Sequence, residues 1–145
     1  MSVVNLYNGI YRVLANDEQI LNYLGLSSAS TNLEKAKHIQ KRSKPQDLVQ
    51  NLPLITFYSP GGFRDSINDY VYGSRFFFDI YTSDDVELAQ NIAQRILDLF
   101  EGEIPPWMGV ENFTCRFEDG HESAVDLANI YCFTIEVIMF ISLAK

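Results

Sequence analysis

The chain has 145 residues, the size of one domain, so we expect residues 1–145 to form a single domain. Hydrophobic residues make up 47% of it and charged residues 21%, proportions that exclude intrinsic disorder and fit a folded globular protein. The formal net charge of −8 argues against a duplex-DNA-binding protein, because Lys and Arg supply most of the affinity for phosphates.

The cysteine content and the distribution of apolar residues indicate the cellular compartment of the protein. Cys115 and Cys132 are the only cysteines, which favours a reducing compartment, the cytoplasm in which the protein is made. Two buried thiols are the simplest interpretation, and a disulfide or a reactive thiol is the alternative. Residues 1–10 lack the features of a signal peptide, and the apolar residues 130–144 are too few to span a membrane. We therefore expect no membrane association.

Apolar residues at helical spacing predict an amphipathic helix at the start of the chain. They are Val3, Leu6, Ile10 and Leu14. A second, shorter helix is expected to follow, with Asn16 as its N-cap. Asp17 and Glu18 then fall in its first turn, where the helix dipole favours acidic side chains, and Gly25 ends it.

A basic run follows over residues 35–44. It contains five of the eleven basic residues of the chain: Lys35, Lys37, Lys41, Arg42 and Lys44. The simplest interpretation is a solvated face. The functional alternative is a patch that meets the acidic surface of a partner. Its candidate contact residues are Lys37, Lys41, Arg42 and Lys44.

Two strands are predicted in the middle of the chain. Residues 53–58 form the first, which ends in a Pro-Gly-Gly turn signal, and residues 62–69 are expected to be a polar loop. The second strand covers residues 70–82, with Phe77 and Tyr81 on its otherwise polar face. A solvated face does not need such side chains, so either a helix or another chain covers it. Phe77 and Tyr81 are therefore candidate residues of a subunit interface.

Residues 84–100 form the clearest predicted helix. Ser83 is its expected N-cap, and Asp84 and Asp85 place negative charge in its first turn. An apolar stripe predicts that this helix packs across a sheet. The stripe consists of Val86, Ala89, Ala93, Ile96 and Phe100.

Strands dominate the C-terminal third. A short strand is expected at residues 113–117, then a turn at Asp119-Gly120, then a long strand at residues 127–143. Trp107 is expected to anchor its own loop, with an interface contact as the alternative. The order of elements indicates an α+β domain. We expect a mostly antiparallel mixed sheet with the long helix and the N-terminal helices packed on it.

Candidate chemistry is sparse. Asp119, His121 and Ser123 contain the residue types of a hydrolytic triad, and Glu118, Asp119, His121 and Glu122 those of a metal site. The simplest interpretation of both groups is a polar turn, because residues so close in a turn do not converge easily. We therefore expect no catalytic residue, no metal and no cofactor.

Charge is distributed unevenly along the chain. Residues 98–126 contain eight acidic residues and one basic residue, Arg116, whereas residues 35–44 contain five basic residues and no acidic one. If the two stretches lie on opposite sides of the domain, copies can associate head to tail and close into a ring. Glu118 and Asp119 are candidate contacts in that case. Mutual neutralisation within one molecule is the alternative.

The chain resembles the tail-terminator, or tail-completion, proteins of long-tailed bacteriophages in the order of its elements over most of its length. The segments that carry the likeness are Ile10-Tyr11 with Leu14, Leu24-Gly25, Leu52-Pro53-Leu54-Ile55, and above all the strand Phe76-Phe77-Phe78-Asp79-Ile80-Tyr81 before a helix with Ala89, Ala93, Ile96 and Leu97.

The resemblance implies a structural virion protein at the head–tail junction, assembled in the host cytoplasm. Such proteins form a ring, usually hexameric, that caps the tail tube, ends its polymerisation and meets the head connector. DNA passes through the lumen without specific binding, which suits an acidic chain. A head–tail stopper, adaptor or minor tail protein is the closest alternative, and a small ligand-binding or enzymatic α+β domain is a more distant one.

Overall fold

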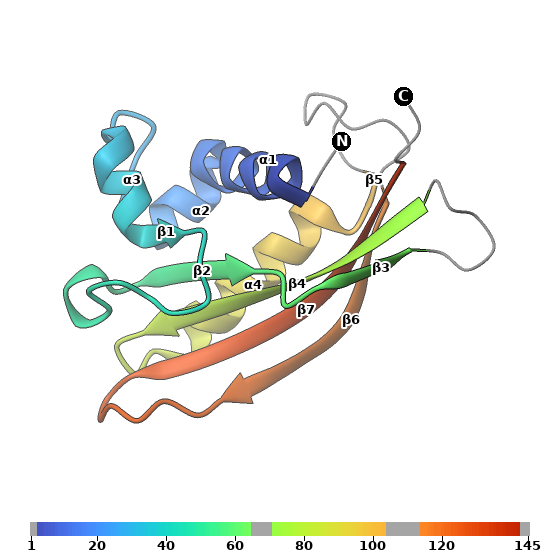
Figure 1. The fold of residues 1–145 in the computed structure, drawn as a ribbon. Helices are drawn as coiled ribbons and strands as arrows, with labels where there is room; N and C mark the ends of the chain where they lie inside the picture. Colours follow the sequence, from blue (N-terminus) through green and yellow to red (C-terminus); the bar gives the residue numbers. More distant parts are fainter. Residues whose placement is uncertain (1–2, 65–70, 104–113, 143–145) are drawn as a thin grey trace.

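Helices cover one face of a mixed sheet (Figure 1). The structure, a computed structural model, describes residues 3–64, 71–103 and 114–142. Its helices are α1 (Val3–Asn16), α2 (Glu18–Tyr23), α3 (Asn32–His38) and α4 (Val86–Phe100), with a 3-10 turn η1 (Val49–Asn51). Its strands are β1 (Ile39–Gln40), β2 (Leu54–Tyr58), β3 (Gly62–Arg64), β4 (Val71–Thr82), β5 (Gly102–Glu103), β6 (Thr114–Ser123) and β7 (Tyr131–Ser142). The predicted α+β class is confirmed.

The sheet is built around one long antiparallel pair. Strands β4 and β7 pair over their full length, from Val71 opposite Ser142 to Thr82 opposite Tyr131. The order across the sheet is β1-β2-β4-β7-β6-β5, and β3 pairs with β4. Strand β1 runs parallel to β2, whereas the other described pairs are antiparallel. The expected mostly antiparallel mixed sheet is therefore present.

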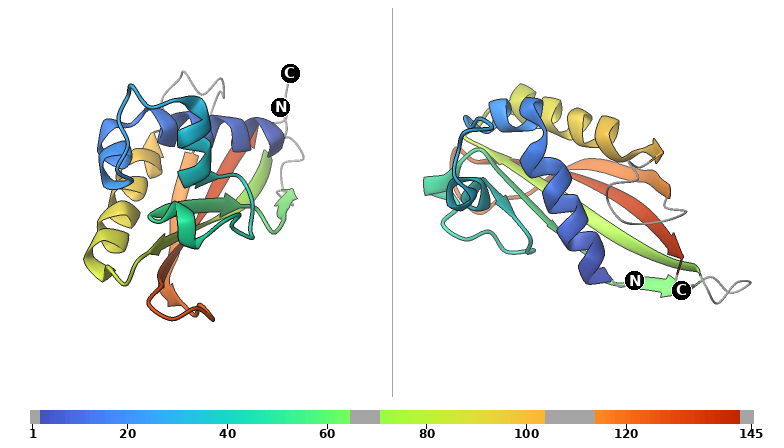
Figure 2. Two further views of the ribbon diagram at one scale, coloured as in Figure 1. Left: turned by 90° about the vertical axis from the view of Figure 1, so that its left-hand side faces the viewer. Right: turned by 90° about the horizontal axis from the view of Figure 1, so that it is seen from above.

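The core lies between the sheet and the helices α1, α2 and α4 (Figure 2). Alternation along the strands directs Phe76, Phe78 and their neighbours into this space. The Phe78 ring lies 5.8 Å from Phe57 of β2 and 5.8 Å from Phe100 of α4. Tyr7 of α1 packs edge-on against Phe76 at 5.1 Å. Aromatic contacts thus fix α1 and α4 on the same face of the sheet.

The cap of α2 differs from the prediction by one residue. The Asp17 carboxylate accepts a hydrogen bond from the Ile20 amide at 3.0 Å, which makes Asp17 the N-cap. Asn16 is still part of α1, and its amide donates to the Arg12 carbonyl at 2.8 Å. Gly25 ends the helix as expected, with a φ of +75° that glycine adopts without strain.

Helix α4 also begins later than predicted. Asp85 is the N-cap, because its carboxylate accepts from the Leu88 amide at 3.0 Å, and Ser83 makes no such contact. Val86 was expected in the buried stripe but is 41% exposed, since it is the first residue of the helix. Ile92 is fully buried and completes the stripe.

Three strand predictions are also corrected. Gly62–Arg64, expected in a loop, forms β3, because Phe63 pairs with Gly73 of β4. Asp119-Gly120 lies inside β6, where a register shift after Phe117 absorbs an extra residue. Strand β7 begins at Tyr131 rather than at residue 127. Asn129, with a φ of +63°, belongs to the preceding turn.

Candidate interaction surfaces

The basic edge of the molecule is formed by α3, β1 and the segment that follows them; it comprises Lys35, Lys37, Lys41, Arg42 and Lys44. The last four side chains are exposed, which fits the solvated-face interpretation. Lys35 is different, because only 9% of it is exposed. Helix α3 was not predicted, although Thr31 and Glu34 have the spacing of a capping box. In the structure the Thr31 hydroxyl accepts from the Glu34 amide at 3.2 Å.

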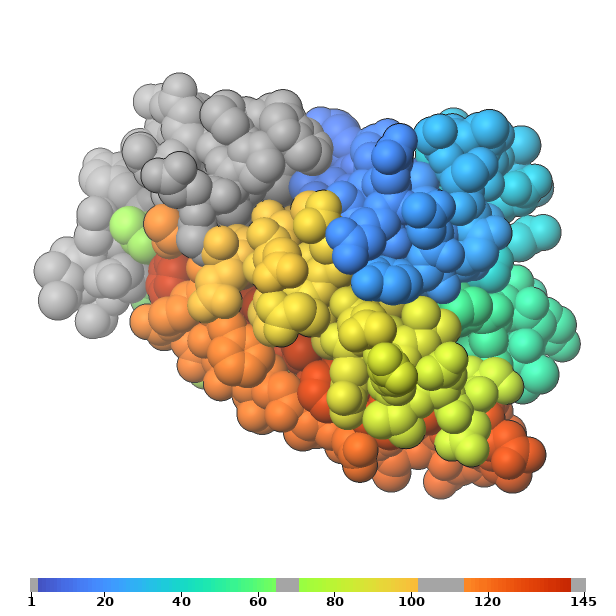
Figure 3. Space-filling model, turned by 180° about the vertical axis from the view of Figure 1, so that it is seen from behind, coloured from blue at the N-terminus to red at the C-terminus, as the bar shows by residue number. Residues whose placement is uncertain are grey.

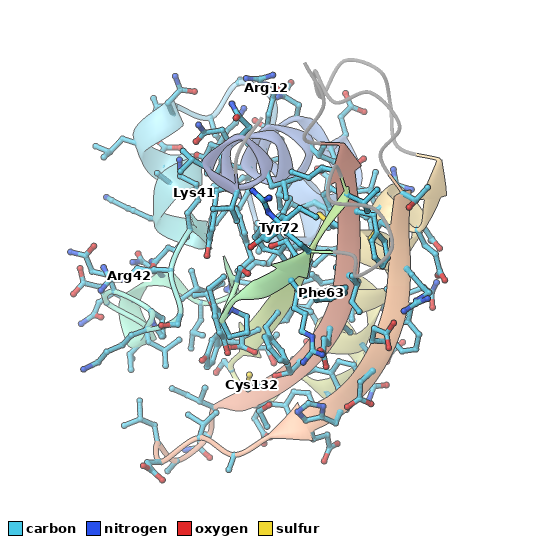
Figure 4. All side chains as sticks on the ribbon, turned by 45° about the vertical axis from the view of Figure 1, so that its right-hand side comes forward. Arg12, Lys41, Arg42, Phe63, Tyr72 and Cys132 are labelled. Atoms are coloured by element: carbon cyan, nitrogen blue, oxygen red, sulfur yellow. The ribbon has the colours of Figure 1, made fainter. Side chains whose placement is uncertain are left out.

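The segment after β1 brings part of the basic edge against α1. Lys41 Nζ donates to Asn8 Oδ1 at 3.1 Å and lies 5.5 Å from the centre of the Tyr11 ring. Arg12, one turn further along α1, lines the same groove (Figure 4). Sequence reasoning missed Asn8 and Arg12 as surface candidates, because only the tertiary contact between α1 and the segment after β1 places them beside Lys41.

The acidic edge of the molecule is strand β6, with Glu118, Asp119 and Glu122 exposed. Glu118 accepts from Arg116 Nε at 2.7 Å, and Asp119 lies 3.3 Å from Nδ1 of His121. Strand β5 pairs only with Thr114 and Cys115 of β6. Within the described chain, the rest of this edge has no strand beside it, and its carboxylates give it a net negative charge.

The two charged edges lie on opposite sides of the sheet. Strands β1 and β6 are separated by β2, β4 and β7. Four spacings amount to about 19 Å, which exceeds the Debye length of about 8 Å at physiological salt. In the view from behind, α3 and β6 lie on either side of the central helices (Figure 3). Among the described residues, no ion pair joins the basic edge to β6, which favours the interpretation of two separate charged surfaces.

Phe77 and Tyr81 lie on the face of the sheet opposite α1 and α4, which we call the open face. Phe77 stacks on Tyr58 of β2 with ring centroids 5.6 Å apart. Both Phe77 and Tyr81 are half-buried, so neighbouring strands cover part of each ring. Of the two explanations for these aromatic residues, cover by α1, α2 or α4 is excluded, because these helices pack on the other face of the sheet. Contact with another chain stays a prediction.

A polar row crosses the open face from one edge to the other. Register places these residues side by side on five strands: Gln40, Thr56, Asp79, Thr134 and His121. Thr134 donates to Asp79 Oδ1 at 2.7 Å, and the Ser123 hydroxyl lies within hydrogen-bond distance of Thr134. Because a hydroxyl has one proton, Ser123 is the donor to Thr134 when Asp79 is ionised. Burial raises the pKa of Asp79, and the Thr134 hydrogen bond and the charge of His121 oppose that rise.

The residues considered for hydrolysis form no triad. Asp119, His121 and Ser123 share one face of β6 instead of a polar turn. Ser123 bonds to Thr134 and not to His121, so His121 is not placed to take the hydroxyl proton. Among the described residues no group of three His, Cys, Asp or Glu side chains lies close enough to bind a metal ion.

The two cysteines are free and buried, as the simplest interpretation predicted. Cys115 is part of the core under the helices, opposite Met139, whereas Cys132 lies on the open face opposite Tyr81. The sheet separates the thiols, so the alternative of a disulfide between them is wrong. Burial raises the pKa of each thiol to about 12.

The predictions for Trp107, for the start of a strand at Phe113, for residues 65–70 and for the strand end at residue 143 lie outside the described residues. The helices that the structure describes are too short or too polar to cross a bilayer. No family model and no curated protein matches the sequence.

A solved structure matches the chain over almost its whole length. It is a chain of the "virion of native gene transfer agent (GTA) particle". The TM-score is 0.62, the sequence identity 12%, and the match covers 94% of this chain and 94% of that one. The two proteins share a fold. Each of the surfaces described above therefore lies on a fold that is also used in a virion.

Proposed function

We propose that this chain is a virion structural protein of the tail-terminator kind. Copies of it form a ring that caps the tail tube, ends its polymerisation and meets the head connector, with a lumen for DNA. The observation that carries this proposal is the shared fold with a chain of the GTA virion, because the match covers almost all of both chains. The proposal includes a location in the virion at the head–tail junction.

The charge distribution supports a ring. A positive and a negative surface at opposite edges of one subunit favour a heterologous contact, in which each copy uses a different surface toward each neighbour. Phe77 and Tyr81 on the open face are further candidate contacts, since half-buried aromatic residues are enriched in interfaces. The net charge of −8 suits a lumen that DNA passes without binding.

Native mass and tube binding test the proposal together. Light scattering of the purified chain, with negative-stain images of the same fraction, is expected to give a ring of about 100 kDa if six copies of 16.6 kDa assemble. Tail tubes from the particle that encodes the chain are then added. A cap at one tube end supports the terminator function, also when the ring forms only on the tube.

A different result separates the alternatives. A chain that leaves tube ends bare but binds the head connector is a stopper or adaptor. A monomer that binds neither tubes nor connector overturns the proposed function.

A further inference from the structure

The groove between α1 and α3 has the composition of an anion-binding surface. It encloses about 460 Å³, and its polar lining comes from both helices and from the segment after β1. Three cations and three carboxamides provide that lining: Arg12, Lys35, Lys41, Asn8, Asn16 and Asn32. None of the described lining residues is acidic. The groove therefore concentrates positive charge in a chain with an acidic excess.

Within the described part of the chain, the three cations of the groove have no acidic side chain paired with them. Among the residues that the structure describes, Arg12, Lys35 and Lys41 take part in no ion pair. Lys35 is only 9% exposed, yet its ammonium nitrogen is not among the buried unpartnered atoms, so its apolar stem is covered while its charged end stays accessible to water. A carboxylate in the groove can accept charge-assisted hydrogen bonds from these cations.

The acidic edge offers carboxylates in a form that fits such a groove. Asp119 and Glu122 project from an extended strand, and Glu118 lies beside them at the register shift. Acidic side chains and a bulge on an edge strand discourage the addition of another strand. Strand β6 is thus suited to contact a partner through its side chains rather than through its backbone.

We infer that the groove between α1 and α3 receives the acidic strand β6 of a second copy of this chain. The inference deepens the proposed ring and rests on it. Each copy supplies one groove and one strand from opposite edges of its sheet, so the contact repeats from copy to copy until the ring closes. Duplex DNA is disfavoured as the occupant, because the negative charge of the whole chain repels it.

Charge reversal tests the contact directly. The groove variant is Arg12→Glu with Lys41→Glu, and the strand variant is Asp119→Lys with Glu122→Lys. All four side chains are exposed, so folding is expected to persist and is checked by circular dichroism. The control is Arg64→Glu, which reverses one positive charge at an exposed residue of β3, outside the basic edge, the groove and β6.

Each two-residue variant brings like charges together at every contact. The protein concentration needed for half-assembly, measured by sedimentation velocity or on tail tubes, is expected to rise at least about tenfold. The chain that carries all four substitutions restores opposite charges and is expected to assemble again. An equimolar mixture of the two variants is expected to assemble for the same reason. The Arg64→Glu control is expected to assemble like the unmodified chain.

The outcomes separate this inference from the proposed function. A ring or tube cap that forms equally well with the groove variant overturns the groove–strand contact and leaves the ring intact. Failure of the four-substitution chain and of the mixture, with folded subunits, also overturns the contact. If the unmodified chain forms neither a ring nor a tube cap, the proposed function fails, and the inference fails with it.

Discussion

Arg95 of α4 binds both carboxylate oxygens of Asp17, the N-cap of α2. The Nε–Oδ2 distance is 3.0 Å and the Nη2–Oδ1 distance is 2.6 Å. The side chains are 29% and 12% exposed, so the pair is partly withdrawn from water. One carboxylate thus caps a helix and connects it to another helix. The position of α2 over the core depends on this contact as well as on apolar packing.

Substituting Asp17 by alanine should destabilise the fold by about 2 kcal/mol, the sum of a lost cap and a lost partly buried ion pair. Urea unfolding measures the free energy. Asp98→Ala is the control, because its exposed carboxylate accepts only from Gln94, and a change within about 0.5 kcal/mol is expected there. Equal effects of the two substitutions would contradict the assigned role of Asp17.

The same pair predicts a dependence of stability on pH. Burial alone would raise the pKa of Asp17, but the hydrogen bond from Arg95, the Ile20 amide and the charge of Arg95 together lower it. The pKa of Asp17 is lower in the folded state than in the unfolded state. Its stabilisation is therefore complete above about pH 3.8, the unfolded value, and is lost as the pH falls through the folded pKa. In the Asp17→Ala variant this part of the acid dependence should disappear. If the free energy of unfolding, measured with urea, falls in acid as steeply in Asp17→Ala as in the unmodified chain, other carboxylates dominate the acid dependence.

Asp79 is expected to change stability with pH in the opposite direction to Asp17. Its raised pKa means that the folded state binds a proton more tightly, so its contribution is most favourable at low pH and is lost as the pH rises above about 3.8 through the folded value. Asp79→Asn retains the oxygen that accepts from Thr134 and removes the buried charge. We expect the variant to be more stable than the unmodified chain at pH 7, with a smaller difference at pH 4. A difference independent of pH would contradict this assignment.

Two glycines in the pairing of β3 with β4 should differ in their tolerance of alanine. A Cβ on Gly62 would lie 2.4 Å from the backbone oxygen of Gly73, which has no room to move. A Cβ on Gly73 would lie 2.7 Å from the Phe63 ring, which is 41% exposed and can turn aside. Thermal unfolding should therefore show a larger loss for Gly62→Ala than for Gly73→Ala. The reverse order would mean that β3 and β4 separate easily.

The two thiols should be inert in the folded chain. Burial of Cys115 and Cys132, with each pKa near 12, leaves almost no thiolate at pH 8. A disulfide-exchange reagent is expected to label neither thiol until urea unfolds the chain, and then to label both. Rapid labelling of one thiol without denaturant would show that its side of the sheet opens locally.

Helices α1, α2 and α4 and the strands β2, β4 and β7 were predictable, because their apolar spacing reflects burial on one face. Caps were less predictable: Asn16 beside Asp17, and Ser83 beside Asp85, are all residue types that cap helices. Tertiary contacts decide between them. The Asp17 carboxylate reaches Arg95, 78 residues further along the chain.

Strand pairing and surface charge could likewise be predicted only where they depend on local sequence and not on tertiary contacts. Local turn signals at Asp119-Gly120 were overridden by pairing with β7, and the short β3 exists only because β4 lies beside it. The unequal charge of the two stretches was visible in the sequence, but their placement at opposite edges required the strand order. Arg12 entered the candidate site only through the groove that α1 forms with α3 and the segment after β1.

Strand β1 has two residues and a single parallel partner, β2, in the described sheet. Few backbone hydrogen bonds hold it, so opening of residues 32–40 is expected to require less free energy than global unfolding. The proposed groove is built on this same segment. Docking of a neighbour and ordering of the segment are therefore linked, and the free energy gained in one favours the other. Amide hydrogen exchange in α3 and β1 should slow when the ring forms, while exchange in the β4–β7 centre stays unchanged.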